Sequence, residues 1–201
     1  MKFVIIIIKI FLIPHVILYK MSKNKEAIEK DIDRWAKAKN KNGSMVSLLF
    51  HFLAFSPDFR TIFYFRNRGI ISSILNIYCR KEKYFRIDKS TKLGGGVLTG
   101  HPYSTILNAE SIGENFYVNH LVTVGEVNGK RPIIGNSVSI YTGAIVIGDI
   151  SIGNNVSIGA GAVVVKDVPN NCTVVGNPAK IVKQDDTKKQ NLPNSLNKKI
   201  N

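Results

Sequence analysis

An apolar residue recurs at every sixth position through the second half of this 201-residue chain. Counted in sixes, these positions are Ile134, Ile140, Val146, Ile152, Ile158 and Val164. A second apolar and often small residue follows four places after each of them, at Val138, Ala144, Ile150, Val156, Ala162 and Val168. A helix needs a period near 3.6 and a strand a period of 2, so a period of six indicates short strands joined by tight corners. The repeat therefore predicts a β-helix, in which successive coils stack on one another.

The same register continues before an interruption in the repeat. Counting back in sixes gives the apolar positions Val124, Val118, Ile112 and Ile106. The residues between Gly125 and Ile133 do not fit the count, so they are expected to form a loop outside the coils. A glycine often follows the apolar residue, and glycine tolerates the backbone conformations that tight corners need.

The first 90 residues show helical patterns instead. Ile28, Ile32 and Trp35 have the spacing of one buried helix face, and Ser44 and Ser56 are candidate N-caps for two further helices. We expect a fourth helix over residues 70–85. The chain is thus divided into an apolar N-terminal extension (1–20), a helical segment (21–90), a β-helix (91–182) and a polar, disordered tail (183–201).

The apolar extension is a poor candidate for a membrane span. Lys9, Pro14 and His15 interrupt it before it reaches the ~20 apolar residues that a spanning helix needs. No small-residue cleavage site follows it, which argues against a signal peptide. We interpret residues 1–20 as an extension upstream of the start at Met21, with a membrane anchor as the alternative.

Most of the net charge of +14 lies in the first 90 residues, and the remainder lies in the tail after residue 182. The first 90 residues carry 18 Lys or Arg against 7 Asp or Glu, whereas residues 91–182 carry 5 of each. No nucleic-acid-binding motif accompanies the charge, so no nucleic-acid partner is expected. Cys79 and Cys172 lie in dissimilar segments and form no disulfide framework, which favours a reducing, cytoplasmic location.

One histidine stands out in the stretch "GGGVLTGHPYSTILNAESIG". His101 is surrounded there by glycines and small side chains, in a fold whose faces offer few groups able to do chemistry. An imidazole can accept and return a proton at neutral pH, so His101 is a candidate general base.

Several segments together resemble a known family. They are "LGGGVLTGHP", "ESIGENFYVNHLVTVG", the insertion "EVNGKRP" and the exit sequence "GAGAVVVKDVPNNCTVVGNPAKIV". From Leu93 to Val182 the chain resembles the hexapeptide-repeat acyltransferases, whose solenoid is a left-handed parallel β-helix. Within them it is most similar to the serine acetyltransferase type and its sugar-modifying relatives. The helical segments "DIDRW" and "FRTIFYFR" are also similar to that type.

The resemblance implies a role for His101. In the family, the histidine of the "GHP"-like segment is the general base for direct transfer of acetyl from acetyl-CoA to a hydroxyl. The aspartate that orients it in the family corresponds to Arg86, and Asp88 is a displaced substitute. His120 has no catalytic counterpart in the family. Because His101 and His120 are the only histidines of the solenoid, the three-histidine zinc site of gamma-type carbonic anhydrases is not expected, and we expect no metal.

The resemblance also implies the binding positions. Small residues at Thr142 and Ala160 would contact the pantetheine arm of acetyl-CoA between adjacent subunits, and Lys166 and Lys180 would meet its phosphates. Lys130 or Arg131, in the insertion, would hold the carboxylate of serine. Serine acetyltransferases have an aspartate just before the histidine, whereas this chain has Gly100.

Three functions remain open at this stage. The first is an acetyl-CoA-dependent serine O-acetyltransferase, towards cysteine biosynthesis. The second is the same reaction on a sugar hydroxyl of a surface polysaccharide, which Gly100 favours. The third is a non-catalytic β-helix scaffold. For either enzyme, a homotrimer or a dimer of trimers is expected.

Overall fold

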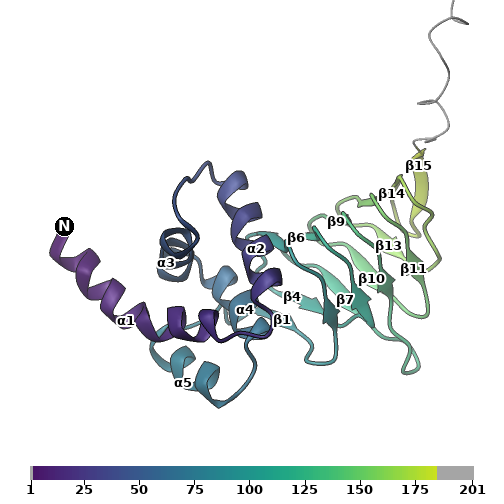
Figure 1. Ribbon diagram of the computed structural model, residues 1–201. Coiled ribbons are helices and arrows are strands. Elements are labelled where there is room, and N and C mark those ends of the chain that lie inside the picture. The colour runs from purple at the N-terminus through teal and green to yellow at the C-terminus, as the bar shows by residue number, and fades with distance from the viewer. Residues whose placement is uncertain (1, 185–201) are drawn as a thin grey trace, which may run out of the picture.

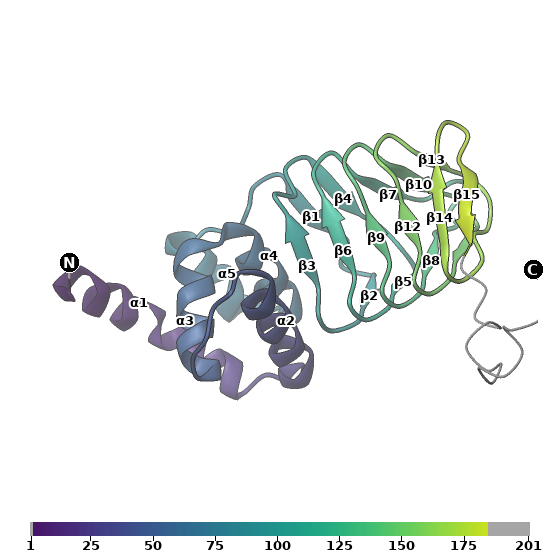
Figure 2. The ribbon, with the colours of Figure 1, turned by 90° about the horizontal axis from the view of Figure 1, so that it is seen from above.

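A bundle of helices caps one end of a β-solenoid in the computed structural model, which describes residues 2–184 (Figures 1 and 2). The helices are α1 (Lys2–Lys20), α2 (Lys25–Ala38), α3 (Met45–Phe55), α4 (Pro57–Arg66) and α5 (Ile70–Tyr78). Fourteen short strands of the solenoid follow: β1 (Phe85–Ile87), β2 (Lys92–Leu93), β3 (Leu98–Gly100), β4 (Thr105–Leu107), β5 (Ser111–Ile112), β6 (Tyr117–Asn119), β7 (Thr123–Gly125), β8 (Ile133–Ile134), β9 (Ser139–Ile140), β10 (Ile145–Ile147), β11 (Ser151–Ile152), β12 (Ser157–Ile158), β13 (Val163–Val164) and β14 (Cys172–Val175). A last strand, β15 (Lys180–Gln184), pairs antiparallel with β14 at the far end.

The strands form three parallel sheets, the faces of a prism. Sheet A contains β1, β4, β7, β10 and β13; sheet B contains β2, β5, β8 and β11; sheet C contains β3, β6, β9, β12, β14 and β15. From β1 to β13, consecutive strands of the chain belong to successive faces, so each circuit adds one coil. The fold is the left-handed parallel β-helix that the repeat and the family resemblance predict, preceded by α-helices.

The inward positions of the repeat fill the solenoid. All twelve apolar positions counted from Ile134 and from Val138 are buried. One earlier position was assigned wrongly: Ile106 is 46% exposed, and Leu107 lies in the core instead. Leu107 is the residue that pairs with Val124, because the coil between them is one residue shorter than three hexads.

The corner between sheets B and C explains why glycine is needed there. A Cβ atom at Gly135 would lie 2.7 Å from the Asn154 side-chain oxygen of the next coil. That oxygen accepts a hydrogen bond from the Asn136 backbone N–H at 2.7 Å. Glycine at this corner therefore makes room for an asparagine that satisfies the backbone of the coil below.

The boundary between helices and solenoid differs from the prediction. The fourth predicted helix ends at Tyr78 rather than residue 85, and the solenoid begins at Phe85 rather than residue 91. Phe85 and Ile87 are both buried and alternate with exposed Arg86, which is the period of a strand. At the other end, β15 continues to Gln184, and residues 185–201 of the predicted tail lie outside the described part of the chain.

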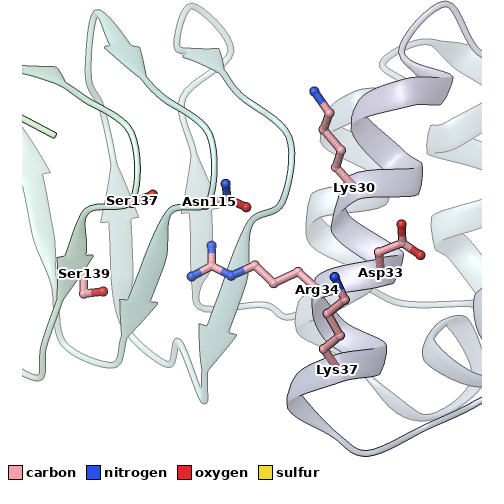
Figure 3. A pocket seen from close by; sticks show the side chains of 7 residues that line it. All are labelled: Lys30, Asp33, Arg34, Lys37, Asn115, Ser137 and Ser139. Carbon is pink, nitrogen blue, oxygen red and sulfur yellow. The ribbon is translucent and has the colours of Figure 1, made fainter. Parts of the chain in front are cut away.

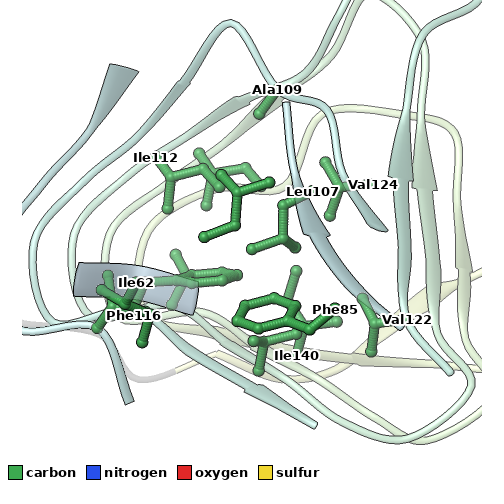
Figure 4. Close-up of a cluster of buried hydrophobic side chains, with 14 of the residues drawn as sticks. Ile62, Phe85, Leu107, Ala109, Ile112, Phe116, Val122, Val124 and Ile140 are labelled. Atoms are coloured by element: carbon green, nitrogen blue, oxygen red, sulfur yellow. The ribbon is translucent and has the colours of Figure 1, made fainter. Parts of the chain in front are cut away.

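The "DIDRW" segment of α2 joins the helices to the first coil. Trp35 donates its indole N–H to the Val97 carbonyl at 2.9 Å, and Asp31 accepts from the Val97 N–H at 2.7 Å. Asp31 also pairs with Arg66 of α4 at 3.0 Å, with both side chains almost fully buried. Ile62 of α4 closes the open end of the prism among the core residues, as Figure 4 shows.

Helix α1 is packed into the bundle rather than appended to it. Leu12, His15 and Tyr19 are buried, and the Nε2 atom of His15 lies 2.8 Å from the Tyr64 hydroxyl. The Tyr19 hydroxyl donates to Glu29 of α2. These contacts weigh against the interpretation of residues 1–20 as a mere upstream extension. Within residues 2–184, no helix has the length and apolarity to cross a bilayer.

Candidate active site

His101 lies at the corner where sheet C turns into sheet A. Strand pairing matches Gly100 with Asn119 and Ile106 with Thr123. Residues 101–105 therefore form the same turn as residues 120–122 of the next coil. The turn that contains His101 is longer by two residues. The additional residues push His101 out of the coil: its side chain is exposed and its φ is +54°. No hydrogen bond to its ring comes from the described part of this single chain, so the imidazole is open to a ligand.

The same corner continues through the later coils. The Gly143 N–H donates to the His120 carbonyl, and the Gly161 N–H donates to the Thr142 carbonyl at 2.8 Å. His120, Thr142 and Ala160 thus occupy equivalent places on successive coils, ~4.8 Å apart. We call residues 101–105, 120–122, 142–144 and 160–162 the His101 corner. Two of the predicted donor-binding positions, Thr142 and Ala160, therefore lie at the same corner as His101. The residue in line with them in the first coil is Tyr103, whose carbonyl accepts from the Leu121 N–H.

Tyrosines flank His101 on both sides, and sequence reasoning had given them no role. The Tyr117 and Tyr141 rings lie 5.9 Å apart on sheet C, and the Tyr84 and Tyr103 rings lie 5.0 Å apart beside sheet A. Burial, with a smaller effect of Tyr141, raises the pKa of Tyr117, so its hydroxyl stays protonated as a hydrogen-bond donor. Strand pairing sets Tyr117 against Ser139 rather than Tyr141, so the two tyrosines hold different places in the coils and their contact was not evident from the sequence.

Tyr117 also explains why position 100 holds glycine. A Cβ atom at Gly100 would overlap the Tyr117 hydroxyl and lie 3.1 Å from its Cζ atom. The space that a side chain would take just before the histidine is therefore filled by a tyrosine hydroxyl.

Asp88 does not lie beside His101 in the chain. It follows β1 at the corner between sheets A and B, whereas His101 follows β3. The Asp88 carboxylate accepts hydrogen bonds from the Ser90 N–H at 2.9 Å and the Ser90 hydroxyl at 2.6 Å. These bonds lower the pKa of Asp88. The prediction that Asp88 orients the histidine of the same chain is therefore corrected: the two side chains belong to different edges of sheet A.

Lys130 and Arg131 share that second corner. The Arg131 guanidinium bonds Glu110 at 2.6 Å and the Ser90 hydroxyl, and Lys130 pairs with Asp149 at 2.5 Å. The carboxylate of Asp149 raises the pKa of Lys130. We call residues 88–91, 108–110, 126–132, 148–150 and 166–167 the insertion corner. A strand of three residues, ~10 Å long, separates it from the His101 corner in each coil.

Lys166 and Lys180, the residues predicted to meet the coenzyme A phosphates, lie in different parts of the solenoid. Lys166 is exposed at the insertion corner, on the far edge of sheet A from Thr142. Lys180 is exposed at the start of β15, where it pairs with Val175 of β14. The turn between these two strands follows the His101 corner at the C-terminal end of the solenoid. Of the two, Lys180 is thus the one placed at the end of the Thr142 and Ala160 column. Among the described residues, no group of three or more His, Cys, Asp or Glu side chains is arranged to hold a metal ion.

A hollow of about 380 Å³ lies elsewhere, between α2 and the solenoid (Figure 3). Its cations are already engaged: Lys30 pairs with Glu114 at 2.7 Å, and Arg34 donates to the carbonyls of Gly96 and Phe116. These bonds attach α2 to the first coils, so the hollow is a feature of the helix–solenoid junction.

The comparisons with known proteins agree with the fold. Residues 131–166 match the bacterial transferase hexapeptide (six repeats) family. Serine acetyltransferase 1, chloroplastic, of Arabidopsis thaliana is 36% identical over 137 residues, which are 64% of this chain and 43% of that protein. The putative colanic acid biosynthesis acetyltransferase WcaB of Escherichia coli (strain K12) is 36% identical over 101 residues, 48% of this chain and 62% of that protein. The crystal structure of Neisseria gonorrhoeae serine acetyltransferase superposes with a TM-score of 0.62 at 29% identity, covering 80% of this chain and 66% of that chain.

By its fold and its repeat, the chain falls in the class of hexapeptide-repeat β-helix proteins. Within that class it is similar to the serine acetyltransferases, and also to a polysaccharide-modifying acetyltransferase. It spans about half the length or less of the first serine acetyltransferases that it matches.

Proposed function

We propose that the protein is an acetyl-CoA-dependent O-acetyltransferase of the serine acetyltransferase type. The observation that carries the proposal is the exposed His101 imidazole, set out from the coil by two additional residues at the corner where later coils carry the small side chains of Thr142 and Ala160. A non-catalytic scaffold would have no need for this local departure from the repeat.

The chemistry follows from what a free imidazole can do. His101 removes the proton from the acceptor hydroxyl while the hydroxyl oxygen attacks the thioester carbonyl carbon. The carbon–sulfur bond then breaks, and the imidazolium returns the proton to the departing thiolate. Acetyl passes directly from sulfur to oxygen, with no acyl-enzyme and no metal.

The donor is proposed to lie along the His101 corner. Thr142 and Ala160 present small side chains there, which leaves room for an extended pantetheine arm. Lys180 stands near the end of this column and is suited to a phosphate of coenzyme A. Lys166, on the other edge of sheet A, is suited to the same ligand only from a neighbouring copy.

A neighbouring copy is expected because His101 and the residues of the insertion corner lie on opposite edges of sheet A within one chain. Apolar residues are exposed on both edges of sheet A: Tyr103 and Leu121 at the His101 corner, and Val127 and Val165 at the insertion corner. If one corner packs against the other corner of the next copy, the head-to-tail contact closes into a homotrimer.

This arrangement gives Asp88, Lys130 and Arg131 a role across the interface. Asp88 and His101 belong to the same coil, and a threefold axis parallel to the solenoid keeps coils at the same level. Asp88 of one copy then orients His101 of the next, and Lys130 or Arg131 pairs with the carboxylate of serine.

A sugar hydroxyl is the second candidate acceptor. The specific observation in its favour is the presence of two tyrosine pairs beside His101, with their rings edge-on or tilted, together with the Tyr117 hydroxyl over Gly100. Aromatic faces and a hydroxyl donor suit a sugar ring better than a free amino acid, whose ammonium calls for a carboxylate.

We also propose a cytoplasmic location. Cys79 and Cys172 are free thiols in the described structure, as expected for a reducing compartment.

The test is an assay of thiol release from acetyl-CoA with L-serine and, separately, with sugar nucleotides and glycans. His101→Ala should lower turnover with the accepted substrate ~10²-fold or more and leave coenzyme A affinity nearly unchanged. His51→Ala, on the surface of α3, is the control and should keep full activity. Turnover of His101→Ala within a few-fold of the parent protein would contradict the role as general base.

A further inference from the structure

Helix α5 presents an apolar face to solvent. Ile70, Ile74 and Ile77 are 81%, 54% and 70% exposed, and Ile71 and Tyr78 are exposed as well. Leu75 and Ser72 are the side chains that α5 buries against the bundle. The helix is thus amphipathic with its larger apolar side facing outward, the reverse of what packing within one chain requires.

Helix α1 extends this surface. Its outward residues Ile10, Phe11, Ile13 and Ile17 are each about half exposed or more. The two helices touch: the Phe11 and Tyr78 rings lie 6.2 Å apart, and the Tyr78 hydroxyl donates to the Phe11 carbonyl at 3.1 Å. The exposed residues of α1 and α5 therefore form one continuous apolar surface, which we call the α1–α5 face. A contiguous surface of this kind marks an interaction site.

The charges around the α1–α5 face are cationic. Helix α5 itself contains no charged residue. Arg68 precedes it, Arg80, Lys81 and Lys83 follow it, and Glu82 is the one acidic residue between positions 68 and 83. Lys20 ends α1. All five cationic side chains are exposed.

We propose that the α1–α5 face docks the protein on an anionic phospholipid membrane surface. An apolar helix face flanked by Lys and Arg is the pattern of helices that lie in the membrane interface, with isoleucines among the acyl chains and cations at the headgroups. The helices lie on the bilayer and do not span it. A second copy is the less suitable occupant, because a symmetric contact would bring the cationic borders of two faces together.

The position of the face is compatible with activity. It lies at the helical end of the molecule, opposite to β15 (Figures 1 and 2). The His101 corner belongs to the solenoid and stays open to solvent when the helical end is docked. This inference does not depend on which hydroxyl is acetylated, nor on the chain being an enzyme.

The experiment is flotation of the full chain with vesicles, either of phosphatidylcholine alone or of phosphatidylcholine mixed with phosphatidylglycerol. The parent protein should float with the anionic vesicles, and less so at high salt. Ile74→Ser with Ile77→Ser should lower the partition coefficient roughly tenfold or more. The matched control is Ile181→Ser with Val182→Ser, which removes two similarly exposed apolar side chains from β15 and should bind as the parent does. Lys81→Gln with Lys83→Gln should weaken binding about fivefold for each charge removed, on anionic vesicles alone.

Light scattering of the same variants separates the membrane from a second copy. The Ile74→Ser, Ile77→Ser variant should keep the parent's mass and circular dichroism. A smaller assembly in this variant, without vesicle binding by the parent, would assign the face to contacts between copies and overturn the proposal. Equal flotation of the α5 variant and the β15 control would overturn it too.

Discussion

Gly100 is the residue that most separates this site from the serine acetyltransferase pattern, and its neighbour Tyr117 shows why a simple exchange will not restore that pattern. The Tyr117 hydroxyl occupies the space of a Cβ atom at position 100. Gly100→Asp should therefore destabilise the fold by about 1–3 kcal/mol through overpacking, measured by urea unfolding.

Tyr117→Ala removes the hydroxyl that would clash with a side chain at position 100, so it is the second substitution to combine with Gly100→Asp. The double variant Gly100→Asp, Tyr117→Ala should be more stable than the sum of the two single changes predicts. If serine is the acceptor, its Michaelis constant should also be lower in the double variant than in Tyr117→Ala alone. Strict additivity of the stabilities would show that the two positions do not compete for space.

His15 is the second residue whose surroundings allow a quantitative prediction. Burial lowers the pKa of His15 to about 4, and its Nδ1 atom is buried without a hydrogen-bond partner. Between pH 6.5 and about 4, His15 is protonated in the unfolded chain but neutral in the folded chain. The contribution of neutral His15 to the free energy of unfolding is therefore complete above pH 6.5 and is lost as the pH falls towards 4. The loss should be on the order of 2 kcal/mol.

His15→Phe should flatten this part of the stability profile. Urea unfolding at several pH values between 4 and 7 measures it, and His51→Phe is the control because the His51 side chain is only partly buried. An unchanged slope in His15→Phe would mean that another group is responsible for the acid sensitivity.

At the scale of elements, the joint between helices and solenoid depends on one buried ion pair. Arg66 pairs with Asp31 and donates to the carbonyls of Leu93 and Gly94. Burial raises the pKa of Asp31, while Arg66 and the Val97 N–H oppose that change. Asp31→Ala should cost about 3–5 kcal/mol, because it leaves the Arg66 charge buried without a partner.

Asp33 offers a matched control on the same helix. Its side chain is exposed, and Asp33→Ala should change the free energy of unfolding by no more than about 0.5 kcal/mol. Chemical denaturation of both variants makes the comparison. If Asp31→Ala costs as little as Asp33→Ala, the pair does not hold the joint.

The elements also show what could be predicted from the sequence. The solenoid could be predicted, because a period of six is incompatible with a helix or an ordinary strand. Nearly every apolar position counted in this way is buried. Helix α1 could not be placed, since a segment as apolar as residues 1–20 reads equally as an extension, an anchor or a packed helix. Only the contact of His15 with Tyr64, 49 residues away, decides that it belongs to the bundle.

The candidate site was predictable in its parts but not in their arrangement. His101, Thr142 and Ala160 fall on one corner, as the family resemblance implies. Asp88 was chosen because it lies two residues from Arg86, the position of the aspartate that orients the histidine in the family. In a solenoid, thirteen residues lead from one corner to another, so closeness in sequence does not bring side chains together.

At the scale of the whole molecule, the proposed mechanism requires assembly, because the His101 corner and the insertion corner are separated within one chain. Sheet A lies between the two corners in every coil, so His101 and Arg131 of one chain act on opposite edges. A head-to-tail trimer places each His101 against a neighbour's insertion corner, and the number of complete sites then depends on how copies are combined.

Mixing two inactive variants tests this directly. His101→Ala lacks the base, and Asp88→Asn with Arg131→Ala lacks the groups contributed by the neighbour. After the two proteins are unfolded and refolded together in equal amounts, about one quarter of the interfaces should pair an intact His101 with an intact insertion corner. Acetyl transfer should therefore recover to roughly a quarter of the parent's rate, although each variant refolded alone stays inactive. If each site were complete within one chain, the mixture would be no more active than the two variants measured separately.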